Sequence, residues 1–250
     1  MSHKSKYNSM SEQMHPDNFI CIIADMIGSR QSLKSKLLPE IVETLNEQAD
    51  ADWIIPFKLR ARDELFAVFT TISAGFRAFF KFHQIAKTYK VRFYMGVGVG
   101  ELEPENRTDQ HRINGPAIWR ASDALKELKQ NPSSEVLKSI SKLDFRYNLH
   151  GSDNKDLNSA LETYLYFVMQ KVESRTVQQN LAIQLFEEHP DWTNAQLYWQ
   201  VSGTDEKRVP VANATANFSK LLARANYHFV REAEESLMAL LQSLSEREKT

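Results

Sequence analysis

The chain of 250 residues has 42% hydrophobic and 25% charged residues, ordinary fractions for globular proteins that exclude a disordered or fibrous chain. Its one cysteine, Cys21, excludes a disulfide framework and a cysteine-based zinc site. The net charge of -1 gives no overall attraction to nucleic acid, so local charge blocks matter more. Residues 1–18 lack the apolar run of a signal peptide, and no later segment has the roughly 20 apolar residues that span a bilayer. We therefore expect a cytoplasmic protein with no membrane partner.

The first half of the chain alternates strand-like and helix-like patterns. Residues 19–25 form an apolar run typical of a strand buried on both faces. The following elements are a helix over 32–48 with a restart at Pro39, a hairpin over 54–59 and 65–69, a helix over 72–89 and a Gly-rich strand over 91–100. This order predicts an α/β (α+β) fold of the ferredoxin-like βαββαβ type, an antiparallel sheet with helices on one face.

The second half becomes purely helical. A helix is expected to open at Gly115-Pro116, and residues 143–149 predict one more strand. A long connector helix is then expected over 157–188, followed by helices over 194–201, 211–225 and 230–244. We predict a flexible segment (1–18), an α/β domain (19–155) and a helical domain (156–250).

Aromatic side chains follow several of the expected helices. The stripe of Phe76, Phe79, Phe80 and Phe82 is typical of a sheet-facing core, and Trp192 and Trp199 are expected in the core of the last helices. The scattered histidines do not form a zinc pattern, and the glycines of the 91–100 strand do not have the dinucleotide-binding spacing. The sequence therefore predicts neither zinc nor a dinucleotide.

Two acids follow strands that should be neighbours. Asp25 ends the first strand and Asp63 lies at the hairpin tip, so an antiparallel pairing would bring their carboxylates together. Such oxygen ligands suit Mg²⁺ or Mn²⁺, although solvated carboxylates at strand ends are the ordinary alternative. Glu64 could assist, although its side chain is expected to face the opposite way from that of Asp63, because neighbouring strand residues alternate.

A turn after the first strand provides groups for a phosphate. Gly28, Ser29 and Arg30 precede a helix, whose first backbone N–H groups attract anions. Arg62, next to Asp63, would pair with phosphates or crowd them. These residues are our candidates for nucleotide binding.

A basic segment lies near the end of the chain. Residues 207–231 contain no acid, and the 211–225 helix should bury one face and leave four polar side chains on the other. Asn pairs with adenine, and Lys and Arg bind guanine or phosphate, so this helix is a candidate DNA-recognition helix. The alternative is the polar face of a helical bundle. The candidate DNA-binding residues are Lys207, Arg208, Asn213, Asn217, Lys220 and Arg224.

Four segments of the first half resemble motifs of class III nucleotidyl cyclases. They are residues 23–30, with Asp25 followed by Gly28-Ser29, residues 62–69, the Gly-rich strand ending in Gly100-Glu101, and residues 115–121. The order of these four motifs, followed by a basic C-terminal segment, resembles that of the bacterial SatD-like family. Members of that family combine such a cyclase-type domain with a C-terminal helix-turn-helix. This resemblance implies a homodimer, a metal site and a DNA partner.

The cyclase pattern is incomplete in this chain. Arg62 stands where the family has a glycine, and Trp119 and Asp123 stand where active cyclases have an asparagine and an arginine. Loss of that arginine should remove much transition-state stabilisation, unless Arg120 or Arg112 replaces it. These departures favour a DNA-binding regulator whose degenerate cyclase-like domain senses a nucleotide or metal, or dimerises. The alternatives are a divergent metal-dependent cyclase or nucleotidyltransferase, and a purely structural protein.

Overall fold

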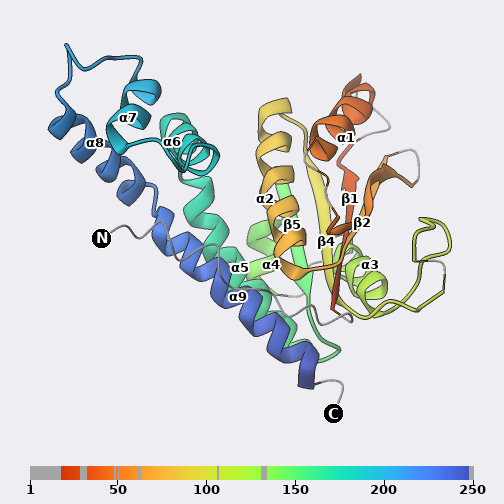
Figure 1. Cartoon of the computed structure of the whole chain (residues 1–250). Helices are drawn as coiled ribbons and strands as arrows, with labels where there is room; N and C mark the ends of the chain where they lie inside the picture. Colours follow the sequence, from red (N-terminus) through yellow and green to blue (C-terminus); the bar gives the residue numbers. More distant parts are fainter. Residues whose placement is uncertain are drawn as a thin grey trace. The chain divides into compact units, whose positions relative to one another are not determined.

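The computed structural model of the protein describes residues 18–28, 33–47, 49, 51–60, 63–105, 107–130 and 134–247. These residues form a mixed α/β structure (Figure 1). Its strands are β1 (Phe19–Met26), β2 (Trp53–Leu59), β3 (Glu64–Phe69), β4 (Phe93–Gly100) and β5 (Phe145–His150). Its α-helices are α1 (Leu38–Asn46), α2 (Ile72–Tyr89), α3 (Pro116–Lys129), α4 (Glu135–Ile140), α5 (Lys155–Glu173), α6 (Val177–Glu188), α7 (Asn194–Ser202), α8 (Val211–Arg224) and α9 (Tyr227–Arg247), and a 3-10 helix at Leu33–Leu37 precedes α1.

The chain divides into two compact units, which we describe separately. The sheet unit contains the described residues up to Tyr166 and those from Leu237, and the helical unit contains Phe167–Ser236. The domain boundary at residues 155 and 156 stays a prediction, and so does the flexible segment 1–18, of which 1–17 lie outside the described residues. None of the described helices is both long and apolar enough to cross a membrane.

The sheet has the order β2-β3-β1-β4-β5. The pairs β2–β3, β3–β1 and β1–β4 are antiparallel, as expected, whereas the added strand β5 runs parallel to β4. Parallel neighbours need a crossover connection, and the segment containing α3 and α4 provides it. The central position of β1 explains why seven of its eight residues are buried.

Helices cover both faces of this sheet, so the expectation of helices on one face is wrong. In Figure 1, α2 lies on one side of the sheet and α3 on the other. Residues of β1 that face α3 pack with Ala117, Ala121 and Leu125, whereas Ile20 on the opposite face meets Gly75 of α2. A strand that is apolar on both sides needs a cover on both sides.

Glycines of β4 allow α3 to approach the sheet closely. A Cβ atom at Gly96 would lie 2.1 Å from the carbonyl oxygen of Ala121, and one at Gly98 would lie 2.2 Å from that of Ala117. Both residues share the α3 face because strand side chains alternate. The expectation that glycines mark a close backbone approach is confirmed, and the approaching element is α3.

The opposite face is an aromatic core. Phe76, Phe79 and Phe82 of α2 are buried as expected, and Phe80 is half-buried. Phe82 meets Phe93 edge to face, with ring centroids 4.8 Å apart. Edge-to-face pairs stabilise a core beyond their buried area, so this cluster fixes α2 against the sheet.

The expected long helix over 157–188 is two helices, α5 and α6. Thr176 caps α6: its hydroxyl accepts a hydrogen bond from the Gln179 N–H, and the Gln179 side chain accepts one from the Thr176 N–H. This capping box satisfies backbone donors that a continuous helix would satisfy internally. The chain can therefore change direction without glycine or proline.

We expect Cys21 to be unreactive until the sheet unfolds. The thiol lies fully buried in β1, and this burial raises its pKa above the ordinary value of 9.0. Because only the exposed thiolate is a nucleophile, a thiol reagent should label the native protein at least about a thousandfold more slowly than the denatured protein. Absorbance with a chromogenic disulfide reagent checks this, and rapid native labelling would contradict it.

A polar network closes the β5 edge of the α3 face. Glu127 accepts a 3.2 Å hydrogen bond from Asn148, and its Oε2 lies 3.2 Å from Nε2 of His150. Burial lowers the pKa of His150 from its ordinary 6.5, although Glu127 opposes this shift. The network therefore holds a largely buried imidazole whose protonation is disfavoured by folding.

We expect acid to destabilise the sheet unit partly through His150. Its folded-state pKa is below the unfolded value, so below about pH 6.5 the unfolded chain binds more protons. The free energy of unfolding should therefore fall as the pH drops from 7 to 5. The fall should be smaller in His150→Gln, which lacks the titrating imidazole. Urea denaturation at the two pH values measures both losses, and equal losses in the two proteins would refute the assignment.

Candidate functional site

The first candidate site is the sheet corner where β1 ends. Asp25 is the Cα partner of Glu64 on β3 and of Tyr94 on β4, so these three side chains share the α3 face. The ammonium group of Lys129, at the end of α3, contacts Oδ2 of Asp25. Its Nζ also lies 6.0 Å from the ring centroid of Tyr94. Elements distant in sequence thus surround the Asp25 carboxylate.

Asp63 lies beside this corner, one residue before β3. Its carbonyl oxygen accepts a 3.3 Å hydrogen bond from the Met26 N–H, which continues the β1–β3 pairing by one position. The residue directly opposite Asp25 is therefore Glu64, whereas Asp63 lies opposite Met26. Glu64 thus shares the face of Asp25, which the sequence pattern predicted for Asp63. The register, which the sequence did not reveal, decides this point. The joint metal role of Asp25 and Asp63 stays a prediction.

Cations accompany the other polar groups of the corner. The Glu64 carboxylate accepts a 2.8 Å hydrogen bond from Nε of Arg60, and both side chains are about three-quarters buried. Arg146 on β5 donates a 2.8 Å hydrogen bond to the Tyr94 hydroxyl. The corner therefore combines its acids with positively charged side chains held in place. Because these ion pairs are partly buried, dissolved salt screens their attraction less than it screens that of surface pairs.

One oxygen of Asp25 fits a cation. Oδ1 is buried and has no hydrogen-bond partner among the residues that the structure describes, while Oδ2 is held by Lys129. A buried carboxylate oxygen without a partner is costly, and an ion or water would relieve that cost. No group of three or more His, Cys, Asp or Glu residues able to hold a metal occurs in the described ranges. The donors seen here are therefore fewer than a complete metal cage requires.

The turn after β1 is described only in part. Gly28 has φ of +75°, in the left-handed region that glycine adopts most easily, and among the described residues no atom lies within 4 Å of where its Cβ would be. The other nucleotide-binding candidates, Ser29, Arg30 and Arg62, lie outside the described residues.

Helix α3 presents the positions that depart from the cyclase pattern. Trp119 is 51% exposed and donates a 2.7 Å hydrogen bond to Asn114, and Asp123 is also exposed. Arg120 is buried and donates to the Val99 carbonyl (2.8 Å) and to Asp153 (3.0 Å). Arg120 therefore anchors β4 to the loop after β5 and is not placed on the exposed face with Trp119 and Asp123. Arg112 lies exposed in the loop before α3.

The second candidate site is α8 in the helical unit. Its buried residues Ala214, Phe218 and Leu222 pack into a core with α6 and α7, as the helical spacing predicted. Thr193 caps α7 as expected, with a full capping box to Gln196. The opposite face carries Asn213, Lys220 and Arg224, all exposed, and Asn217, which is half-buried. Helix α8 thus presents two amides and two cations together.

The turn before α8 adds two more exposed cations, Lys207 and Arg208. The Asp205 carboxylate accepts a 3.0 Å hydrogen bond from the Arg208 backbone N–H, so this acid is used to shape the turn. Arg231, in the same basic stretch, pairs instead with Glu234 at 2.9 Å. In the described part of the chain, no carboxylate forms an ion pair with Lys220 or Arg224.

Comparison with protein-family models, curated proteins and solved structures found no match.

Two features of these sites were missed from the sequence. Lys129 reaches Asp25 across 104 positions, and no local pattern indicates that the end of α3 meets the end of β1. Trp192 and Trp199 are half-buried and line an open pocket. Trp192 also packs against the core of the helical unit, as expected, whereas its part in a pocket was not predicted. The signal for the pocket was the spacing of Trp192, Gln196, Trp199 and Gly203, which repeats on one helix face.

Proposed function

We propose that this protein is a DNA-binding regulator that reads duplex DNA through α8. The observation that carries the proposal is the exposed set of Asn213, Lys220 and Arg224, with no ion-pairing carboxylate among the described residues. Amide and cationic side chains on one helix face suit the major groove. In this proposal α7 and α8 form a helix-turn-helix, and Lys207 and Arg208 in its extended turn bind phosphates.

The sheet unit acts in this proposal as a degenerate nucleotide-cyclase-like domain of the SatD-like type. The strand order β2-β3-β1-β4 supports a ferredoxin-like core, because it is the order that a βαββαβ chain adopts in that fold. The loss of the cyclase asparagine and arginine, with Trp119 and Asp123 in their places, argues against catalysis. The domain senses a nucleotide and metal or pairs two chains, and thereby sets the spacing of two α8 helices.

A metal in this domain would be Mg²⁺ or Mn²⁺, held by Asp25 and Asp63. The partnerless Oδ1 of Asp25 supports such a site, and Lys129 occupies the other oxygen. When bound, the ion would neutralise phosphate charge on a nucleotide.

Salt-dependent DNA binding tests the regulator proposal. We would titrate the full chain against a fluorescent pool of random duplexes and measure anisotropy at increasing salt. Lys207, Arg208, Lys220 and Arg224 together should give a slope of log K against log salt of about −3 to −4 per chain. Absence of duplex binding, or binding insensitive to salt, would refute the proposal.

A divergent cyclase or nucleotidyltransferase is the second candidate, favoured by the same free oxygen of Asp25. Each nucleoside triphosphate would be incubated with the full chain and Mg²⁺ or Mn²⁺, and the products separated by chromatography. We expect no cyclic or linked product. A product that disappears in Asp63→Asn would establish the enzyme instead.

A further inference from the structure

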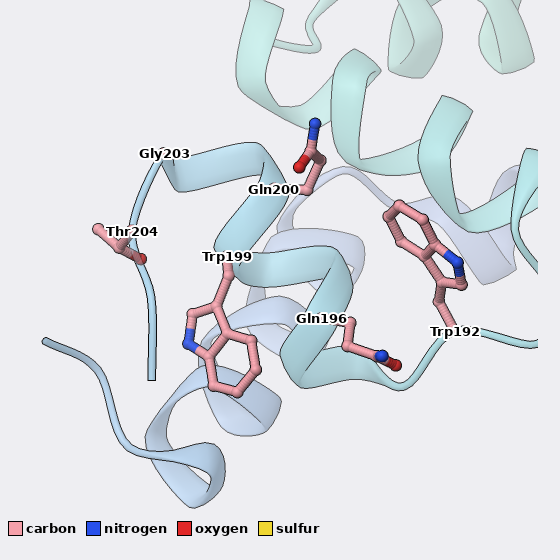
Figure 2. Close-up of a pocket in the computed structure, with 6 residues that line it drawn as sticks. All are labelled: Trp192, Gln196, Trp199, Gln200, Gly203 and Thr204. Atoms are coloured by element: carbon pink, nitrogen blue, oxygen red, sulfur yellow. The ribbon is translucent and has the colours of Figure 1, made fainter. Parts of the chain in front are cut away.

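The helical unit contains an open pocket lined by residues of α7 and of the chain directly before and after this helix. Its volume is about 450 Å³, within the range of small-molecule sites, and it is lined by Trp192, Gln196, Trp199, Gln200, Gly203 and Thr204. Figure 2 shows the indole rings of Trp192 and Trp199 on either side of Gln196. All of these residues belong to the helical unit, and none belongs to the α8 face discussed above.

Both indole rings are held in place before any ligand arrives. Trp192 stacks on His189, with ring centroids 4.0 Å apart and planes 10° apart. Trp199 donates a 3.0 Å hydrogen bond from Nε1 to the Val209 carbonyl. A fixed ring loses little conformational freedom on binding, so its surface suits stacking of a flat ligand.

The two glutamines provide polar groups at the edge of these rings. Oε1 of Gln196 is used in the α7 cap, where it accepts a 2.8 Å hydrogen bond from Thr193, so its NH₂ group remains as a fixed donor. Gln200, one turn further, is exposed and forms no hydrogen bond through its amide with the residues described. A free glutamine amide offers one donor side and one acceptor side, the pattern that pairs with the edge of a nucleobase.

The pocket borders the beginning of the basic turn at Thr204, and Lys207 and Arg208 are not among its lining residues. Thr204 donates a 3.1 Å hydrogen bond from its N–H to the Trp199 carbonyl, and Val209 accepts one from the Trp199 ring. Trp199 therefore fixes both ends of the segment that carries Lys207 and Arg208. Lys207 and Arg208 follow the pocket-lining Thr204 by three and four residues, so we expect them to favour a ligand with a phosphate over an uncharged sugar or peptide.

We propose that this pocket binds a nucleobase that carries a phosphate, stacked against Trp192 and Trp199 and contacted at its edge by Gln200. The base belongs either to a free nucleotide or to an unpaired stretch of DNA. The inference does not require duplex binding by α8, and it goes beyond the role proposed for that helix.

Binding of adenosine monophosphate (AMP) to the full chain tests the proposal. We expect saturable quenching of indole fluorescence, confirmed by calorimetry. Trp192→Ala should weaken binding about fivefold to a hundredfold, the measured range for loss of a stacking ring, and Trp192→Phe should restore most of it. Gln200→Ala should weaken binding at least threefold, whereas Gln170→Ala, which removes an exposed amide on α5, should change nothing.

Additional binding measurements show whether the base comes from a free nucleotide or from unpaired DNA, and whether another class of ligand binds instead. Single-stranded oligo(dA) that binds more tightly than AMP indicates unpaired DNA, and AMP that binds as tightly or more tightly indicates a free nucleotide. Circular dichroism shows whether each variant is folded. The proposal is overturned if AMP and oligo(dA) do not saturate, if Trp192→Ala and Gln200→Ala bind as the parent does, or if an oligosaccharide or a proline-rich peptide binds the pocket in their place.

Discussion

Replacing Lys220 and Arg224 together by alanine should weaken duplex DNA binding at least about tenfold. Both side chains are exposed on the polar face of α8, and neither packs into the core formed by Phe218 and Leu222. Removing a cationic side chain that contacts a phosphate lowers the magnitude of the salt slope by about 0.9. Removing one that contacts a guanine costs about 1–3 kcal/mol of binding free energy. Anisotropy titrations at two salt concentrations therefore measure both the loss and its origin.

A matched control removes two positive charges elsewhere. Lys155 and Lys171 are exposed on α5, so Lys155→Ala with Lys171→Ala changes net charge equally without touching α8. We expect this control to retain nearly the parental affinity. If both double variants weaken binding equally, the effect comes from overall charge and the α8 assignment is wrong.

Gly98→Ala should strongly destabilise the sheet unit. The new Cβ would lie 2.2 Å from both the Ala117 carbonyl oxygen and the Ala121 nitrogen, and both are backbone atoms of α3. A helix backbone cannot rotate away as a side chain can, so α3 must separate from the sheet. Overpacking a core ordinarily costs about 1–3 kcal/mol, and we expect about 3 kcal/mol or more here, measured by urea denaturation.

Gly100 provides the comparison for this prediction. A Cβ there would lie 3.0 Å from Pro116 Cβ and 3.1 Å from the Ala117 nitrogen, at the beginning of α3. These contacts need only a few tenths of an ångström of adjustment, so Gly100→Ala should cost clearly less than Gly98→Ala. Equal stability of Gly98→Ala and the parent would mean that α3 does not pack against β4 as described.

Much of the sheet unit could be predicted because its patterns are local. The apolar run of β1, the hairpin of β2 and β3 and the α2 helix follow directly from hydrophobic period and turn residues. The cover of α3 over the second face could not be predicted, since alternating glycines indicate a close neighbour without identifying it. The break at Thr176 was missed because its only local signal is a capping box inside an otherwise helical pattern.

The candidate site was less predictable than the fold. Asp25 was found because it ends a buried strand, but the identity of its neighbours depends on strand register, which brought Glu64 opposite it. The ion pair with Lys129 depends on where a distant helix ends. In the helical unit, the period of α8 was sufficient to identify its polar face, because amphipathic spacing determines which side is buried.

Strand β2 has a consequence for self-association. It lies at one border of the sheet, contains Pro56, and its pairing with β3 shifts register between Trp53 and Ile55 and again between Ile55 and Lys58. A proline lacks the amide hydrogen that a docking strand would need, and an irregular border offers no straight row of donors and acceptors. Another chain therefore cannot extend the sheet readily at this border, and any strand that joined the sheet edge to edge would have to do so beside β5, at the other border.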